Sequence, residues 1–368
     1  MGSSIAIGVC GAVIVSLVCF DVFQSIILPR ATSRRLRIAP LLIGKILWPS
    51  YRTIVGSLPS SWKTSWYRAF APLAFVTLIG VWLSLLIFGF AFIILTVGDC
   101  VKPPITRLSD AIYFAGTSVL TLGFGDLIAT DWPARAIVLI AAMLGLVFMA
   151  LGVSLLFSMQ TYLQQREQIV NTLMSRAGSP ASGVVLLLRY RELNIVPSLA
   201  NTFVHWEIWV ASILESHCAY PLLAHFRSGI AENSWLASVG ATLDAATLLL
   251  TTIDKEWVGE ADLYYWMAAN TLKSISTHLA LVPIDEETIT YSEYLQALEF
   301  LKDANYKIKD SQSSFEYFKA RHSGYMRYLL ALSRYLELPR HVWLPEFKDY
   351  SSALQANKSL AQLVPDRQ

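Results

Sequence analysis

Two long uncharged stretches enclose a short segment that contains two glycines, and this order constrains the fold more than any other feature. Ala69 to Val97 and Ala136 to Met159 contain no Asp, Glu, Lys or Arg. Each is longer than the roughly 20 residues that an α-helix needs to cross a bilayer. Between them, Thr121 to Asp126 reads Thr-Leu-Gly-Phe-Gly-Asp. Non-helical backbone at membrane depth is tolerated only where protein buries it or where it lines water. The order predicts a reentrant loop between two spans.

The alternating glycines of this loop predict an ion filter made of backbone carbonyls, which replace the hydration shell of a cation. Successive carbonyls of an ordinary strand point to opposite sides, so a filter needs alternate residues in dihedrals that L-residues avoid. Gly123 and Gly125 can adopt a left-handed conformation at little cost. We expect Thr121 to add a hydroxyl ligand, and Leu122 and Phe124 to pack against supporting structure. The alternative is a glycine-containing turn that only resembles a filter.

A short helix is expected directly before the loop. Ser109 is a candidate N-cap for a pore helix over 109–120, with Asp110 in its first turn. The carboxyl end of this helix would direct negative dipole charge toward a bound cation. The predicted pore module is therefore a span, a pore helix, a filter over 121–126 and an inner helix over 136–159.

The segment from about Ala69 to Met159 resembles the pore module of the potassium channel family. The family signature is Thr-Val-Gly-Tyr-Gly-Asp, and Phe is a known variant at the Tyr position. The resemblance implies that Asp126 is the outer-mouth carboxylate and that Tyr113 and Phe114 brace the filter. It implies that the potassium-binding selectivity filter consists of Thr121, Leu122, Gly123, Phe124 and Gly125.

The same resemblance assigns the gating elements. Gly145 lies 24 residues after Thr121, where the inner helix of the family commonly carries its hinge glycine. Gly152 is a second expected flex point. The inner helices are expected to close near their cytoplasmic ends, at Leu155, Ser158 and Met159.

The chain departs from the family pattern at three filter positions. Leu122 replaces Val, Leu120 stands where a second Thr is common, and Phe124 lacks a phenol. These departures leave open a weakly selective channel for sodium and potassium. A membrane-anchored receptor or adaptor with a silent pore is a further alternative. No nucleophile, base or phosphate-binding constellation indicates an enzyme.

The amino terminus predicts a third span over 1–28, apolar except for Asp21. No Lys or Arg precedes it, so it lacks the basic region of a cleavable signal peptide. The linker over 29–68 is basic and contains no Asp or Glu, which predicts a cytoplasmic location. The amino terminus is then outside, the carboxyl-terminal region is cytoplasmic, and a plasma (inner) membrane is expected.

Several features of these segments have more than one reading. The apolar residues from Leu41 to Trp48 predict either an interfacial helix on the inner leaflet or a packed linker. Asp21 is a sensor, or it pairs with a nearby cation such as Arg30, or it reaches interfacial water. Cys100 is either a subunit bridge or a free thiol.

The chain after Met159 predicts an inner-helix extension and linker over 160–183, and a cytoplasmic helical domain over 184–368. Thr290 with Glu293, and Ser313 with Glu316, match capping boxes. Trp235 to Ile253 is either a helix of this domain or a minimal fourth span.

The regulatory ligand or protein partner of this domain stays unknown. No nucleotide fingerprint and no nucleic-acid motif is present. A metal site is weakly suggested by His205, Glu207, Glu215 and His217 on consecutive predicted turns.

One filter loop does not enclose an ion, so four copies around an axis are expected. The composition agrees with a membrane protein that has a sizeable soluble part, because charged residues are only 15% of the chain, against about 25% in soluble domains. The predicted fold is an all-α membrane protein with three transmembrane helices, a reentrant pore helix and filter, and a cytoplasmic helical domain. No cofactor is expected besides permeant potassium ions, and the other partner is the lipid bilayer.

Overall fold

The computed structural model describes residues 2–27, 38–229, 234–254, 258–286, 289–309, 311–339 and 341–344. The chain forms two compact units. Unit 1 comprises Met1–Tyr162 and Cys218–Phe226, and unit 2 comprises Leu163–His217 and Arg227–Gln368. Arg30, the predicted partner of Asp21, lies outside the described residues.

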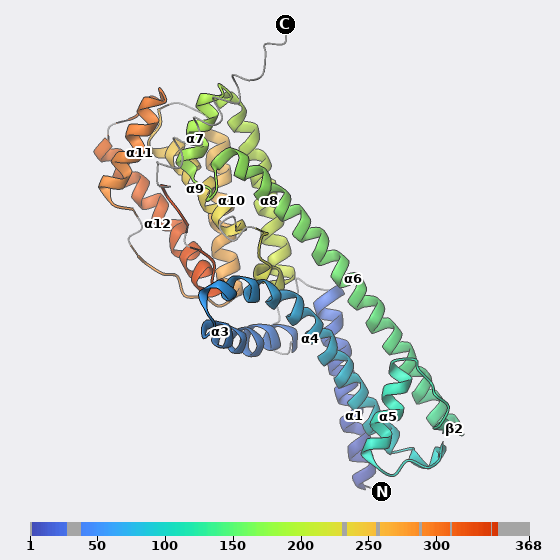
Figure 1. Ribbon diagram of the computed structural model, residues 1–368. Helices are drawn as coiled ribbons and strands as arrows, with labels where there is room; N and C mark the ends of the chain where they lie inside the picture. The colour runs from blue at the N-terminus through green and yellow to red at the C-terminus, as the bar shows by residue number, and fades with distance from the viewer. Residues whose placement is uncertain are drawn as a thin grey trace. The chain divides into compact units, whose positions relative to one another are not determined.

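Unit 1 consists of helices and one small strand pair (Figure 1). Its elements are α1 (Gly2–Val22) with a π-helical turn η1 (Phe23–Ile27), α2 (Ile38–Leu41), η2 (Leu42–Leu47), α3 (Trp48–Gly56), α4 (Ser60–Leu95), η3 (Gly98–Cys100), β1 (Val101–Lys102), α5 (Leu108–Val119), β2 (Ile128–Ala129), the first part of α6 (Trp132–Ala177), and η5 (Pro221–His225).

Three of these helices are long and apolar enough to cross a membrane: Ser4–Ile26, Ser60–Leu95 and Trp132–Ala177. They suggest a membrane protein, as the sequence predicts. α4 extends beyond its predicted span, because it begins at Ser60 instead of Ala69. α6 continues past Met159 to Ala177, within the segment predicted as an inner-helix extension and linker.

α1 packs along α4 through small residues and one buried carboxylate. A Cβ on Gly11 would lie 2.4 Å from the carbonyl oxygen of Gly89, so the two backbones approach closely where both lack side chains. Near the other end of α1, Asp21 is buried and accepts a hydrogen bond from Trp82 Nε1 at 2.7 Å. It also accepts one from the Ile38 amide at 2.7 Å. Hydrogen-bond donors of the protein thus stabilise the buried Asp21 carboxylate in place of water.

α3 and the first turns of α4 form a helical hairpin, and α3 lies across the direction of α1 (Figure 1). Aromatic rings fill its inner face. Trp48 lies 4.7 Å from Phe70 between ring centroids, and Tyr51 lies 5.1 Å from Phe70. The segment η5 returns from far along the sequence to this face, where His225 lies 4.8 Å from Trp48.

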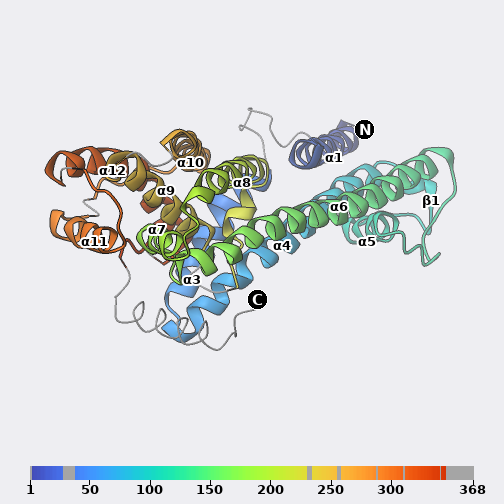
Figure 2. The same ribbon diagram turned by 90° about the horizontal axis from the view of Figure 1, so that it is seen from above.

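Unit 2 is a helical bundle, as predicted for the carboxyl-terminal region. Its helices are the end of α6, α7 (Gly183–Glu192), the turn η4 (Val196–Ser198), α8 (Leu199–Ala219, up to His217), α9 (Trp235–Thr251), α10 (Val258–His278), α11 (Tyr291–Asp303) and α12 (Ser311–Leu336). α9 lies among α7, α10 and α12 (Figure 2). Every residue of α9 is buried, so helix packing accounts for the apolar stretch that resembles a minimal span.

A polar cluster lies at the centre of unit 2. Asp244 of α9 is fully buried and accepts hydrogen bonds from the Tyr325 hydroxyl and from His341 Nε2. His322 Nε2 lies 3.6 Å from the same carboxylate. Burial lowers the pKa of His322 to about 4, although Asp244 opposes this shift. Trp343 packs on His322 at 6.0 Å between ring centroids, so the segment after α12 closes over the cluster.

The two predicted capping boxes have different outcomes. Thr290 is the N-cap of α11, and both reciprocal bonds with Glu293 are present, so this prediction is confirmed. The second prediction is wrong, because α12 already begins at Ser311 and Ser313 lies inside it.

Candidate functional site

The helix α5 places the start of the predicted filter. It begins at Leu108, with Arg107 as N-cap and no side-chain cap bond. The prediction that Ser109 caps this helix is wrong, because its hydroxyl donates to Asp110 Oδ1 at 3.1 Å from within the first turn. α5 contacts α4 along its length and ends at Val119.

α5 ends in a Schellman motif whose left-handed position is Thr121. The Leu122 amide donates to the Thr117 carbonyl at 2.8 Å, and the Thr121 amide donates to the Ser118 carbonyl at 3.1 Å. This pair of bonds requires a left-handed residue at Thr121, where glycine is usual. Thr121 has a φ of 55°, an unfavourable value for a β-branched residue. Such a conformation costs roughly 1–2 kcal/mol.

The left-handed conformation recurs at every second residue of the loop. Gly123 has a φ of 58° and Gly125 a φ of 83°, which confirms the conformation expected of the two glycines. With Thr121, three alternate residues share it. Leu122 and Phe124 are 55% and 68% exposed, so the described residues of the same chain do not supply the supporting structure expected around them.

The carboxylate that follows the loop lies near α5. The Tyr113 side chain, on α5, is close enough to Asp126 to interact with it electrostatically. Phe114, the second predicted bracing residue, is buried, and its carbonyl accepts a bond from Ser118 Oγ at 2.7 Å. α5 therefore places a phenol, that of Tyr113, near the outer carboxylate.

A two-stranded antiparallel ribbon closes the base of the loop. Val101 of β1 pairs with Ala129 of β2, and Lys102 pairs with Ile128. Arg135 Nε also donates to the Ala129 carbonyl at 3.2 Å. Chain segments before α5 and after the filter are thereby held together. The amino end of α1 lies at the same end of unit 1 (Figure 1), the relation that the predicted topology requires.

Gly145 of α6 lies directly against the end of α5. A Cβ on Gly145 would be 1.9 Å from the carbonyl oxygen of Val119 and 2.8 Å from its carbonyl carbon. Gly152, by contrast, has the flexible Cδ1 atom of Ile79 at 3.2 Å as its nearest neighbour. The predicted hinge glycine is thus a point of close backbone approach, next to the first filter residue.

The predicted gate residues lie mainly on the face of α6 that packs within the chain. Leu155 and Met159 are buried, and Ser158 is half-buried. A separate stripe of apolar residues is exposed at spacings of three and four residues. This stripe consists of Leu139, Met143, Leu146, Ala150, Val153 and Phe157. Phe157, which the sequence prediction omitted, is 68% exposed.

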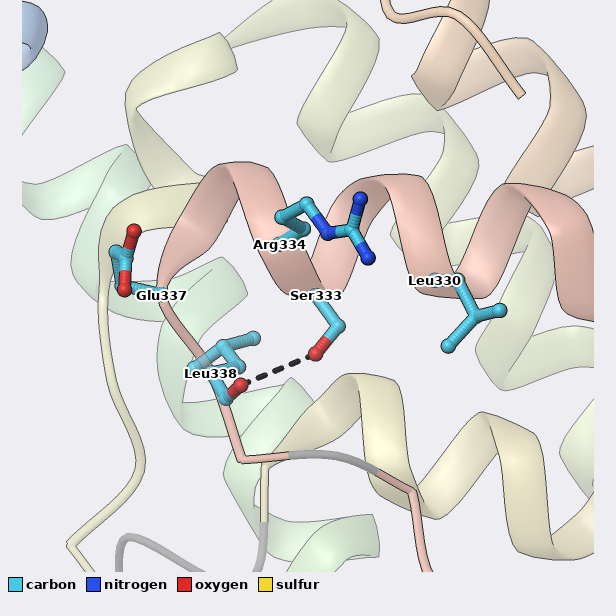
Figure 3. A pocket seen from close by; sticks show the side chains of 5 residues that line it. All are labelled: Leu330, Ser333, Arg334, Glu337 and Leu338. Atoms are coloured by element: carbon cyan, nitrogen blue, oxygen red, sulfur yellow. Dashed lines mark hydrogen bonds between the residues drawn. The ribbon is translucent and has the colours of Figure 1, made fainter. Parts of the chain in front are cut away.

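Unit 2 offers weaker candidate sites. Among the described residues, no group of three His, Cys, Asp or Glu side chains is placed to hold a metal ion. His205 bonds to the Asn201 carbonyl, and His217 lies 3.4 Å from Arg166. A cavity of about 150 Å³ at the end of α12 is lined by Leu330, Ser333, Arg334, Glu337 and Leu338 (Figure 3).

The polar groups of this cavity are already paired. Ser333 Oγ donates to the Leu338 carbonyl at 3.0 Å, as Figure 3 shows. Arg334 pairs with Glu286 at 2.7 Å. The cavity therefore carries no functional assignment, and the loop after α5 remains the best site.

Residues 80–162 match the family model described as "Ion channel". This match supports a pore-loop ion channel family for this part of the chain. It covers less than a quarter of the chain and includes α5, the loop and the membrane part of α6. It suggests passive ion conduction rather than catalysis. No curated protein and no solved structure matches the chain.

Proposed function

We propose that the protein is a potassium-selective channel that conducts ions passively as a homotetramer. The observation that carries the proposal is the left-handed conformation at Thr121, Gly123 and Gly125, in the loop that the ion-channel match includes. Alternating handedness turns successive carbonyls toward one side, which a dehydrated cation requires. The exposed Leu122 and Phe124 side chains would be covered by neighbouring copies.

The membrane path follows from the same geometry. Ions would occupy rings of carbonyls from Thr121 to Gly125, with Asp126 at the outer mouth in a plasma membrane. The exposed stripe of α6 would face the axis or the neighbouring copies. The gate is therefore proposed at Val153 and Phe157 rather than at the buried Leu155 and Met159. Unit 2 would bias opening through its direct continuation from α6.

Cation flux into liposomes tests the proposal. The purified protein is reconstituted and driven by a potassium or a sodium gradient, with Gly123→Ala as the test variant. Alanine at a φ of 58° is strained by roughly 1–2 kcal/mol per subunit. Gly80→Ala is the matched control, because a Cβ on Gly80 meets nothing within 4 Å.

Three outcomes separate the candidates. Potassium flux without sodium flux, lost in Gly123→Ala and kept in Gly80→Ala, supports the proposal. Equal flux of both ions would favour the weakly selective channel, for which Leu120, Leu122 and Phe124 provide the reason. Absence of flux from folded tetramers in every condition would favour the receptor with a silent pore.

A further inference from the structure

The hairpin of α3 and the first turns of α4 exposes large apolar side chains outside the stretch predicted to span the membrane. Trp62 is 60% exposed, Trp66 is 43% exposed and Ile54 is 64% exposed. Their inner-face neighbours, Trp48 and Phe70, are buried. The hairpin thus carries aromatic residues on both faces, one packed within the chain and one exposed.

The exposed tryptophans continue a stripe that begins within the span. Trp62, Trp66, Ala69, Leu73 and Val76 follow one another at spacings of three and four residues along α4, which places them on one helix face. Leu73 and Val76 are exposed and lie within the charge-free stretch. The exposed face of the charge-free stretch therefore extends without interruption into the hairpin.

The length of α4 places the tryptophans outside the hydrocarbon core. Its 36 residues measure about 54 Å at 1.5 Å per residue, whereas the hydrocarbon core is about 30 Å thick. The part from Leu73 to Leu95, directly after the internal Pro72, is about 35 Å long and fills the core when tilted. The turns that carry Trp62 and Trp66 precede Pro72 and belong to the hairpin, whose helix α3 lies across the direction of α1 (Figure 1). A hairpin that runs across the spans lies along the polar boundary, where tryptophan is enriched.

The charge of the hairpin fits one kind of surface. Residues 38–71 contain four cations, Lys45, Arg52, Lys63 and Arg68, and no Asp or Glu. Lys45, Arg52 and Arg68 are exposed. Cations beside membrane-inserted aromatic residues favour anionic lipid over neutral lipid.

We propose that the hairpin of α3 and α4 is a binding surface for anionic phospholipid of the inner leaflet. Trp62, Trp66 and Ile54 enter the boundary between headgroups and acyl chains, and Lys45, Arg52 and Arg68 pair with the headgroups. Of the two predictions for Leu41 to Trp48, the packed linker then describes the inner face of the hairpin, and the interfacial helix describes its exposed face.

The inner face connects this lipid contact to the rest of unit 1. The Tyr51 hydroxyl donates to the Trp66 carbonyl at 2.6 Å, and Trp48 and Phe70 hold His225 of η5. Next to η5, Tyr220 lies 6.0 Å from Tyr162 on α6. If the protein conducts ions as proposed above, anionic lipid is expected to alter conduction through this contact.

Quenching of a fluorescent label by brominated lipids tests the lipid contact directly. The four free cysteines are replaced with serine, and Trp62→Cys in the full chain is labelled with an environment-sensitive dye. Glu299→Cys on α11 is the labelled control, because Glu299 is exposed in unit 2. Vesicles contain brominated phosphatidylcholine or brominated phosphatidylglycerol at equal mole fraction. The melting temperature of each variant is compared with that of the cysteine-free parent.

Both lipids should quench the label at position 62, and neither should quench the label at position 299. At position 62, the anionic lipid should quench several times more than phosphatidylcholine. Arg52→Gln/Arg68→Gln should remove most of that preference, because each cation beside the anionic leaflet strengthens binding to it, whereas Lys302→Gln/Lys307→Gln should not. Absence of quenching at position 62 overturns the lipid contact. The contact is also overturned if the label at position 62 is already buried in detergent, because a second copy of the chain then covers this surface. Equal quenching by both lipids overturns headgroup recognition. None of these measurements requires conduction, so their failure is separable from failure of the channel proposal.

Discussion

Replacement of Gly145 by alanine is expected to disturb the filter rather than only stiffen the inner helix. The added Cβ would lie 1.9 Å from the Val119 carbonyl oxygen, and ordinary contact begins at 3.4 Å. The two backbones must therefore separate by about 1.5 Å. The movement displaces backbone of two helices, α6 at Gly145 and the buried end of α5 at Val119, and not a flexible side chain. Overpacking of this kind costs typically about 1–3 kcal/mol.

The displacement acts two residues before Thr121. The amides of Thr121 and Leu122 are anchored to carbonyls of the same helix end, so movement of Val119 carries the start of the filter with it. We therefore expect Gly145→Ala to lower the melting temperature by several degrees and to raise sodium flux relative to potassium flux.

The control is Gly152→Ala, in which the new Cβ meets only the mobile Cδ1 of Ile79 at 3.2 Å. It should melt and select ions like the parent protein. A hinge role for both glycines predicts similar gating defects in the two variants instead. Unchanged stability and unchanged ion selectivity in Gly145→Ala would refute the packing argument.

Three further predictions concern other parts of the chain. Trp82→Phe removes a donor from the buried Asp21 carboxylate and should destabilise the packing of α1 on α4 by about 1–3 kcal/mol, seen as earlier thermal unfolding, whereas an unchanged unfolding curve would contradict this role. His322 titrates near 4 in the folded state and near 6.5 when unfolded, so the unfolded chain binds more protons between these values and stability should fall as pH decreases from about 6.5 toward 4. His322→Gln should flatten that part of the pH dependence, and an equally steep curve in this variant would assign the effect elsewhere. Thr290→Ala should cost about 1 kcal/mol by removing the cap of α11, measured by denaturant unfolding, with Ser313→Ala as a control that lies inside α12.

The sequence was informative where the structure depends on near neighbours. Long uncharged runs fix spans because no partner is needed to satisfy a helical backbone in lipid. Gly123 and Gly125 predict left-handed backbone because the absence of a Cβ is a property of the residue itself. Thr121 has no such signal. Its conformation follows from the way α5 ends, which the side chain at position 121 does not reveal.

Sequence reasoning was least informative where distant segments meet. One partner of Asp21 is Trp82, 61 residues away, and reasoning from nearby charges did not point to it. The inner-helix pattern gave the position of Gly145 but not the face of α6 that packs on α5. For the same reason it named Leu155, Ser158 and Met159 as the gate without reference to the exposed stripe, which carries Val153 and Phe157. The apolarity of α9 was ambiguous until its neighbours in unit 2 were known.

The return of Cys218–Phe226 to unit 1 has a consequence for dividing or recombining this chain. A cut after α6 looks natural in the sequence, because the glycine- and serine-containing segment there resembles a domain linker. Such a truncation would remove His225 and uncover the rings of Trp48 and Phe70. Unit 1 is therefore not a contiguous stretch of sequence. A chimaera that exchanges the helices of unit 2 for those of another protein would have to retain residues 218–226 and join the foreign segments on both sides of them.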